Sequence, residues 1–169
     1  MVSHVDVHHA DCTYSEENYV QEVNMKLDIY LADLFVLYQK LHVIHWNITG
    51  RQFKAFHAFT EDLYDEVHAK FDTVAEIYRM KEKFPPSKIK DYLDKSTLKE
   101  TPANRAFGID EATEIIIGDL EAMRELALEV RKEHEKDDDF VVVNEIEDHV
   151  ADYDKHLWFM RATLAKENK

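Results

Sequence analysis

Apolar residues recur at steps of three and four along most of the chain, with polar residues between them. The first apolar stripe contains Val20, Val23, Leu27, Leu31, Leu34, Leu37, Leu41, Ile44 and Ile48. This spacing marks one face of an α-helix. Ser15 followed by Glu16 and Glu17 is typical of a helix start, and Gly50 after Thr49 is typical of a helix end. The pattern therefore predicts a helix from about residue 15 to residue 49.

The same spacing predicts three further long helices. The second is expected from about Gln52 to Lys83, because Pro85 and Pro86 then stop it. The third is expected over about 109–136, with a stripe of Ile109, Ala112, Ile116, Leu120, Met123, Ala127 and Val130. The fourth should follow the acidic turn 137–139 and span about 141–166, with Ile146, Val150, Tyr153, Leu157 and Leu164 facing inward.

The connection between the second and third helices is too long for a bare loop, and its segment 87–95 is predicted to form a short helix. Only three glycines and three prolines occur, which disfavours a fold rich in hairpins. Four long helices with one long middle connection predict an all-α, ferritin-like four-helix bundle over residues 15–169. Residues 1–14 are predicted to form a flexible N-terminal tail.

The chain is strongly acidic, with a formal net charge of −14. This charge argues against a generally basic nucleic-acid surface and suits the attraction of cations. Cys12 is the only cysteine, so no intrachain disulfide is expected and a reducing compartment is favoured. Neither a signal peptide nor an apolar stretch of membrane-spanning length is recognisable. A cytoplasmic or nucleoid-associated protein with no membrane partner is expected.

Five potential metal ligands lie on the predicted second helix: His57, Glu61, His68, Asp72 and Glu76. At about 100° per residue they map to roughly 0°, 40°, 20°, 60° and 100°, which places them on one stripe. Carboxylates together with imidazoles suit iron, manganese or zinc. The alternative is that this stripe is only the solvated face of a charged helix.

The length of the stripe limits how a metal site can form. Glu61 and Asp72 are about 16 Å apart along the helix axis, and no single ion or close ion pair bridges that distance. An antiparallel two-fold copy of the helix would bring each His57/Glu61 pair to the Asp72/Glu76 pair of the partner. A di-iron site within one bundle would need Glu-x-x-His motifs, and none of the ten histidines has Glu three residues earlier.

On the first helix, His42 and His45 precede Trp46. Taken by themselves, these residues are more typical of satisfied core histidines and a core aromatic than of ligands.

Two segments carry a resemblance to a known family. The stretch LHVIHWNITGRQFKAFHAFTEDLYDEVHAKFDTVAE (41–76) resembles the signature of the Dps mini-ferritins, and DKHLWFMRATL (154–164) resembles their fourth helix. The similarity covers about residues 20–166. It implies that His45 and His57 are metal ligands and that Trp46 lies next to the site. Glu61 stands where many members have Asp, and Asp72 and Glu76 match acids supplied by the facing subunit. His42 and His68 match no ligand of the family.

The resemblance also implies a function. It implies a homododecameric, hollow iron-storage protein with its metal site at the dimer two-fold. Such a protein is a ferroxidase that oxidises Fe(II), preferably with hydrogen peroxide, and protects against oxidative stress without an organic cofactor. The catalytic set would be His45, Trp46, His57, Glu61, Asp72 and Glu76.

Three further features of the sequence leave alternatives open. Family pores are lined by acids near the start of the fourth helix, where this chain has Phe140 and Asn144; the compensating acids would be Glu135, Asp139, Glu145 or Asp148. The alternative function is DNA binding and compaction, but the tail lacks Lys and Arg, and DNA contact needs clustered cations. Tail residues His4, Asp6, His8, His9 and Cys12 would form either a peripheral metal site or only a histidine-bearing tail.

Overall fold

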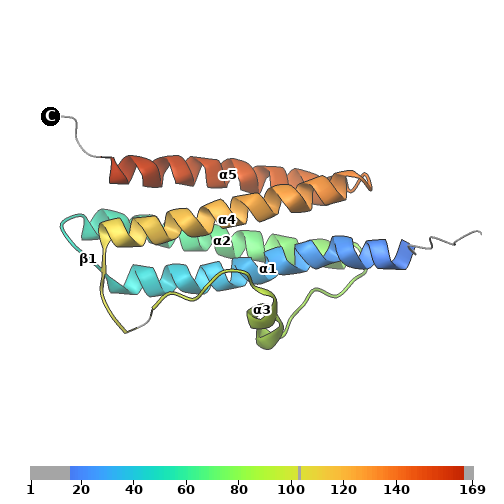
Figure 1. Ribbon diagram of the computed structural model, residues 1–169, viewed down its shortest axis with the longest axis horizontal. Helices are drawn as coiled ribbons and strands as arrows, with labels where there is room; N and C mark the ends of the chain where they lie inside the picture. Colours follow the sequence, from blue (N-terminus) through green and yellow to red (C-terminus); the bar gives the residue numbers. More distant parts are fainter. Residues whose placement is uncertain (1–15, 103, 166–169) are drawn as a thin grey trace, which may run out of the picture.

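The computed structural model describes residues 16–102 and 104–165, with side chains from residue 25 onward. Its long helices are α1 (Glu16–Asn47), α2 (Phe53–Met80), α4 (Ile109–Glu135) and α5 (Phe140–Leu164), and α3 (Ile89–Lys95) is short. The predicted all-α bundle with a short extra helix is therefore confirmed (Figure 1). The predicted tail, with its histidines and Cys12, lies outside the described residues, as do the side chains of Val20 and Val23.

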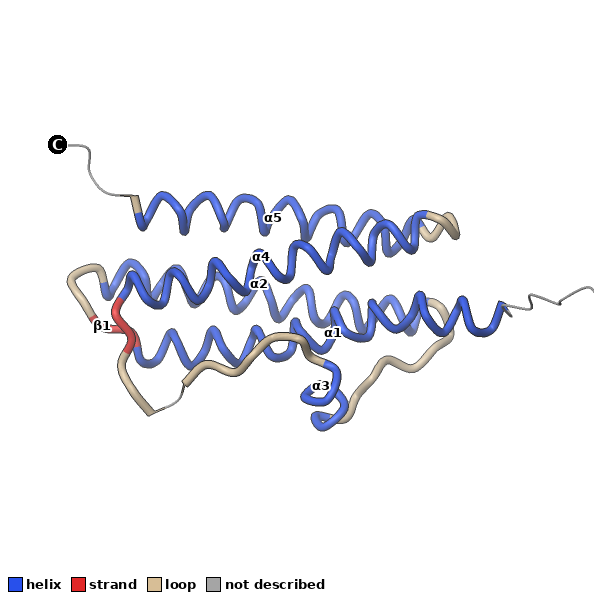
Figure 2. Tube along the Cα trace, in the orientation of Figure 1, coloured by secondary structure: helices blue, strands red, loops and turns tan. Residues whose placement is uncertain are grey.

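Two helical hairpins and one long crossover make up the bundle. The pairs α1/α2 and α4/α5 are each antiparallel and joined by a short link (Figure 2). The connection from α2 to α4 returns along the length of the bundle and carries α3, which packs on α1. At its end, β2 (Phe107–Gly108) pairs in parallel with β1 (Ile48–Thr49), with Phe107 opposite Ile48. This pairing ends the first helix two residues before its predicted end.

Two helices end in turns made by non-glycine residues. After α2, Glu82 adopts φ 59°, while the Lys83 and Glu82 N–H groups bond the carbonyls of Tyr78 and Arg79. This is a Schellman arrangement. It ends α2 at Met80, three residues before the end predicted from the prolines. Asp138, with φ 53°, ends α4 in the same way.

The predicted apolar stripes form the core. In the first stripe every residue from Leu27 to Ile48 is buried. In α4 the stripe is buried from Ala112 to Val130, and Ile109 is partly buried. Core packing therefore follows the helical periodicity of the sequence. No helix in the part of the chain that the structure describes has the length and apolar character needed to cross a bilayer.

The core also contains a polar chain that periodicity did not predict. The Tyr30 hydroxyl lies 2.7 Å from the Tyr153 hydroxyl and 2.9 Å from Nδ1 of His149. Nε2 of His149 lies 3.0 Å from a carboxylate oxygen of Glu145. A neutral His149 satisfies this chain, because its Nε2–H donates to Glu145 while Nδ1 accepts the Tyr30 hydroxyl.

We expect this histidine to make the protein sensitive to acid. Burial, helped by the charge of Lys70, lowers the pKa of His149 to about 3. The unfolded chain takes up this proton near pH 6.5 and the folded chain only near pH 3, so the free energy of unfolding falls as the pH drops from about 6.5 towards 3. Thermal unfolding of His149→Gln should depend less on pH over that range than unfolding of the natural protein. Equal pH dependence of the two proteins would contradict this assignment.

The connection after α3 is anchored on a buried carboxylate. Asp33 of α1 is 1% exposed and accepts hydrogen bonds from the Thr97 N–H and the Ser96 hydroxyl, both at 2.6 Å. It also accepts the Thr97 hydroxyl at 2.7 Å and the Leu98 N–H at 3.2 Å. Four donors on one carboxylate fix the course of the crossover beside α1.

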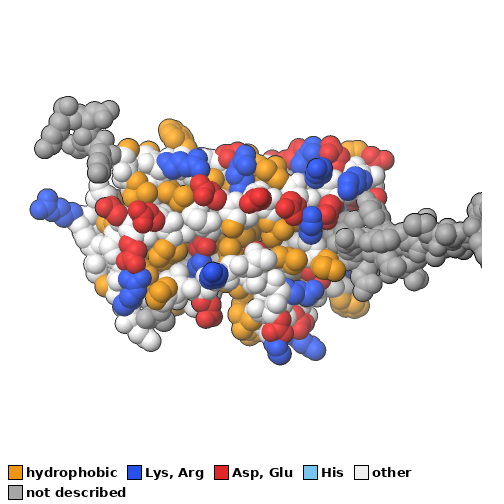
Figure 3. Space-filling view, viewed as in Figure 1, with side chains coloured by type: hydrophobic (Ala, Val, Ile, Leu, Met, Phe, Trp, Pro, Cys, Tyr) orange, Lys and Arg blue, Asp and Glu red, His pale blue; other side chains and the backbone are white. Residues whose placement is uncertain are grey.

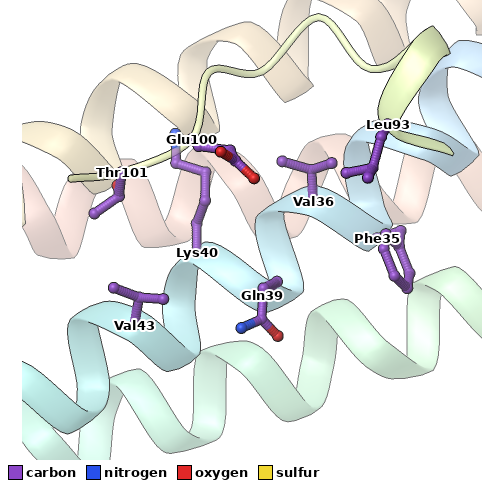
Figure 4. A pocket seen from close by; sticks show the side chains of 8 residues that line it. All are labelled: Phe35, Val36, Gln39, Lys40, Val43, Leu93, Glu100 and Thr101. Carbon is purple, nitrogen blue, oxygen red and sulfur yellow. The ribbon is translucent and has the colours of Figure 1, made fainter. Parts of the chain in front are cut away.

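A cavity of about 190 Å³ lies between α1 and this same connection (Figure 4). Its lining consists of Phe35, Val36, Gln39, Lys40, Val43, Leu93, Glu100 and Thr101. The amino group of Lys40 is bound at 2.7 Å by the carboxylate of Asp119. None of the predicted ligands lines this cavity, so the candidate chemistry lies on another side of α1.

Candidate metal site

The link between α1 and α2 brings the first two predicted ligands together. Gly50 adopts φ 135°, and its carbonyl accepts the Phe53 N–H that begins α2. A side chain at Gly50 would be strained at this φ and would meet Ile109 at 3.4 Å. The tight turn places the last turn of α1 against the first turns of α2, and there His45 meets His57.

The two imidazoles hold each other through reciprocal hydrogen bonds. Nδ1 of His45 donates to the backbone carbonyl of His57 at 3.0 Å, and Nδ1 of His57 donates to the carbonyl of His45 at 3.0 Å. The rings are stacked, with centroids 3.6 Å apart. Because a carbonyl only accepts, each Nδ1 carries a proton, and in the neutral form of each ring Nε2 therefore keeps its lone pair.

Thr60 strengthens this arrangement. Its hydroxyl donates to the carbonyl of His57 at 2.9 Å and lies 3.1 Å from Nδ1 of His45, from which it accepts. Burial lowers the pKa of His45, and the charge of nearby His57 acts in the same direction. A neutral imidazole with a fixed Nδ1–H and a free Nε2 is the form that binds a metal ion.

Glu61 lies one turn beyond His57 on the exposed side of α2. Its charge acts on His45, where it opposes the fall in pKa caused by burial. Burial and the neighbouring Glu61 carboxylate raise the pKa of Tyr64. One chain therefore presents two imidazoles and one carboxylate at the same end of the α1/α2 pair.

An aromatic ladder continues from this point along α1 and α2. The ring of His42 stacks on Tyr64 at 3.9 Å and meets Trp46 at 5.3 Å, while its Nδ1 donates to the carbonyl of Tyr38. Tyr38 in turn contacts His68, with ring centroids 5.3 Å apart. The sequence analysis missed Tyr38, Thr60 and Tyr64. The spacing of Tyr38, His42 and Trp46 at four-residue steps was the available signal.

Trp46 differs from the core aromatic expected of an isolated tryptophan. It is 62% exposed in the single chain, beside the histidine cluster. This position agrees with the neighbour-of-site role that the family resemblance implies. The physical reason is the helical register, because Ile44 and His45 occupy the inward positions and turn Trp46 outward.

The remaining two predicted ligands lie elsewhere. Asp72 and Glu76 are exposed on the second half of α2, more than about 20 Å along the axis from His57. Within the described residues, no three His, Cys, Asp or Glu side chains of one chain come together as a metal-binding group. One chain thus presents two separate groups of ligands on the same helix face.

The acids expected near the pore do not all face outward. Asp139 binds Nδ1 of His134 at 2.8 Å and also pairs with Lys81, while Glu145 binds His149. Asp148 is exposed, as is Phe140. The lining of a pore between chains stays a prediction, and Asp148 is the acid least engaged inside the chain.

Comparisons with known proteins agree with the fold. The model of the ferritin-like domain matches residues 25–169. The DNA protection during starvation protein of Listeria innocua is 31% identical over 136 residues, which cover 80% of this chain and 87% of that protein. This chain belongs to the Dps family. The chain also resembles the DNA protection during starvation protein of Brevibacillus brevis. The two are 30% identical over 154 residues, which cover 85% of this chain and 95% of that protein.

Solved structures support the same assignment of the Dps-family chain. Antigen TpF1 from Treponema pallidum superposes with a TM-score of 0.84 at 28% identity, over 91% of this chain and 98% of that one. The Dps protein from Bacillus brevis superposes with a TM-score of 0.83 at 26% identity, over 89% and 100%. The four-helix architecture and the family predicted from the sequence are therefore both confirmed.

Proposed function

We propose that this protein is a ferroxidase that oxidises Fe(II) with hydrogen peroxide and stores the ferric product. One subunit supplies His45, His57 and Glu61, and a second subunit supplies Asp72 and Glu76. The observation that carries this proposal is the pair of imidazoles whose Nδ1–H groups are fixed by each other's backbone carbonyls. A storage surface without redox chemistry would not require two preorganised nitrogen donors on a face that also carries three carboxylates.

The residues divide the chemistry between them. Neutral imidazoles bind Fe(II) well, whereas carboxylates are the harder ligands that favour Fe(III). Two Fe(II) ions give one electron each to a peroxide; the O–O bond breaks, and with two protons two waters form. Because both electrons are consumed in one site, no hydroxyl radical is released. The indole of Trp46, which is exposed in the single chain, would lie beside ions bound there.

The surface of the single chain favours self-association. Large apolar side chains are exposed at Met25, Trp46, Phe53, Met80, Phe84, Ile89, Leu93, Leu128, Phe140, Val141 and Trp158. On the face shown in Figure 3, apolar side chains are spread among acidic and basic ones. Exposed apolar area of this kind is typical of subunit interfaces. We propose the hollow homododecamer of the family, in which the acidic charge draws Fe(II) inward.

Protection of DNA would then be chemical. Withdrawal of Fe(II) and peroxide removes both reactants that generate hydroxyl radicals, and this needs no contact with nucleic acid. The net charge of −14 opposes phosphate binding, and no observation in the described residues favours DNA compaction.

The stoichiometry of the reaction tests this proposal. We expect the assembled protein to consume about two Fe(II) per hydrogen peroxide, because each peroxide accepts two electrons. Ferric absorbance gives the iron oxidised, a peroxide electrode gives the oxidant consumed, and a spin trap should detect no hydroxyl radical. Consumption of one Fe(II) per peroxide with radical formation would show free-solution chemistry and exclude the ferroxidase.

A further inference from the structure

The proposed ligands are arranged symmetrically along α2. The midpoint between His57 and Glu76 is the same as the midpoint between Glu61 and Asp72, and it lies between residues 66 and 67. A two-fold axis through that point makes both proposed iron sites equivalent. Any other pair of residues on the same stripe with this midpoint would also meet its own copy across the axis.

Asp65 and His68 form such a pair. They have the same midpoint, and at about 100° per residue they map to roughly 80° and 20°, inside the arc of the other four residues. The two-fold axis that places Glu61 opposite the partner's Asp72 therefore also places Asp65 opposite the partner's His68. The same contact occurs a second time between His68 and the partner's Asp65. The four side chains fall within about 4.5 Å along the helix axis, close enough for one ion.

The structure leaves this pair available. Asp65 and His68 are both exposed, and among the described residues neither has a hydrogen-bond or ion-pair partner. His68 is held against the α1/α2 face by the ring of Tyr38. Their neighbours on the helix point the other way: Lys70 pairs with Asp152 and Glu66 with His156, both on α5. No cation on this stretch of α2 therefore neutralises Asp65 within the chain.

We infer that the dimer axis holds a third metal site, distinct from the two proposed iron sites. Two imidazoles and two carboxylates around a two-fold axis give four ligands, the set that suits a tetrahedral Zn²⁺-type divalent cation. With no open position on the ion, this site would fix the two subunits to each other rather than catalyse oxidation. The inference rests on the proposed function, because both use the same register of α2 against its copy.

Cobalt(II) is the probe, because its tetrahedral complexes absorb strongly in the visible range. The chelator-stripped assembly of His57→Ala/Asp72→Ala, which lacks two proposed iron ligands per chain, is titrated with Co²⁺. We expect one ion per two chains with an intense tetrahedral band. Adding His68→Ala or Asp65→Ala should weaken binding at least about 100-fold, since each removes two of four ligands. Asp62→Ala, an exposed acid of α2 at roughly 140° and therefore off the stripe, is the matched control.

Sedimentation checks that each variant stays assembled. If the His57→Ala/Asp72→Ala variant does not assemble, Co²⁺ bound per chain is instead compared between the natural protein and its His68→Ala variant. An unchanged tetrahedral band in His68→Ala overturns the inference. Absence of the tetrahedral band when His68 and Asp65 are both intact also overturns the inference. The two residues would then form only an ion pair between subunits. Mixing His57→Ala with Asp72→Ala subunits distinguishes a failure of this inference from a failure of the proposed function. If mixing restores iron oxidation, the antiparallel register of α2 is supported and only the third metal site is contradicted.

Discussion

Assemblies of His57→Ala alone, or of Asp72→Ala alone, should oxidise Fe(II) with peroxide roughly 100-fold more slowly than the natural protein or worse. Even partners that only orient a metal ligand are worth roughly 10- to 100-fold, and here a proposed ligand itself is removed. The His57→Ala variant lacks one of the two fixed Nε2 donors. The Asp72→Ala variant lacks a carboxylate that is exposed on the second half of α2. The measurement is the initial rate of ferric absorbance.

Mixing the two variants makes the result specific to a shared site. In a heterodimer, the Asp72→Ala chain keeps its histidines and the His57→Ala chain keeps its Asp72, so one of the two sites is complete. Random mixing after disassembly and reassembly should restore about one quarter of the natural rate, because half of the dimers are mixed. Reassembly of each variant alone is the control. No recovery on mixing would mean that the ligands do not combine across subunits.

Replacing Asp33 with Ala should have the largest effect on stability. The change removes the buried acceptor of the Thr97 N–H and of two hydroxyls, while the Leu98 N–H keeps only its bond to the Ser96 hydroxyl. We expect a loss of about 3 kcal/mol or more, since a hydrogen bond to a charged group contributes roughly 1.5–3 kcal/mol. The thermal midpoint should fall by about 6–12 °C.

Asp33→Asn is the matched variant, because it keeps one acceptor oxygen and should lose less stability than the alanine variant. Amide exchange should accelerate first at residues 96–98, where the crossover leaves its anchor. If Asp33→Ala unfolds at the natural temperature with unchanged exchange there, the carboxylate does not hold the crossover.

The ligand set of the predicted site stays a prediction, but the structure places two of its residues side by side. His45 and His57 are twelve residues apart, and only a resemblance connected them before the structure placed their rings 3.6 Å apart. Periodicity located Glu61, Asp72 and Glu76 on one face of α2, but spacing cannot show which backbone carbonyl an imidazole will find. Thr60 and Tyr64 were missed because their roles depend on how α1 packs against α2.

The sequence by itself determined the elements that depend on local order along the chain. These are the four long helices and α3, the inward stripes, and the one-sided row of ligands on α2, all of which follow from the period of the α-helix. Tertiary structure alone decided the contacts between distant segments. The pairing of Ile48 with Phe107, the anchoring of residues 96–98 on Asp33 and the hydrogen bonds of Tyr30 with Tyr153 and His149 all join residues from different elements. No pattern within one helix specifies them, because packing selects which buried polar groups meet.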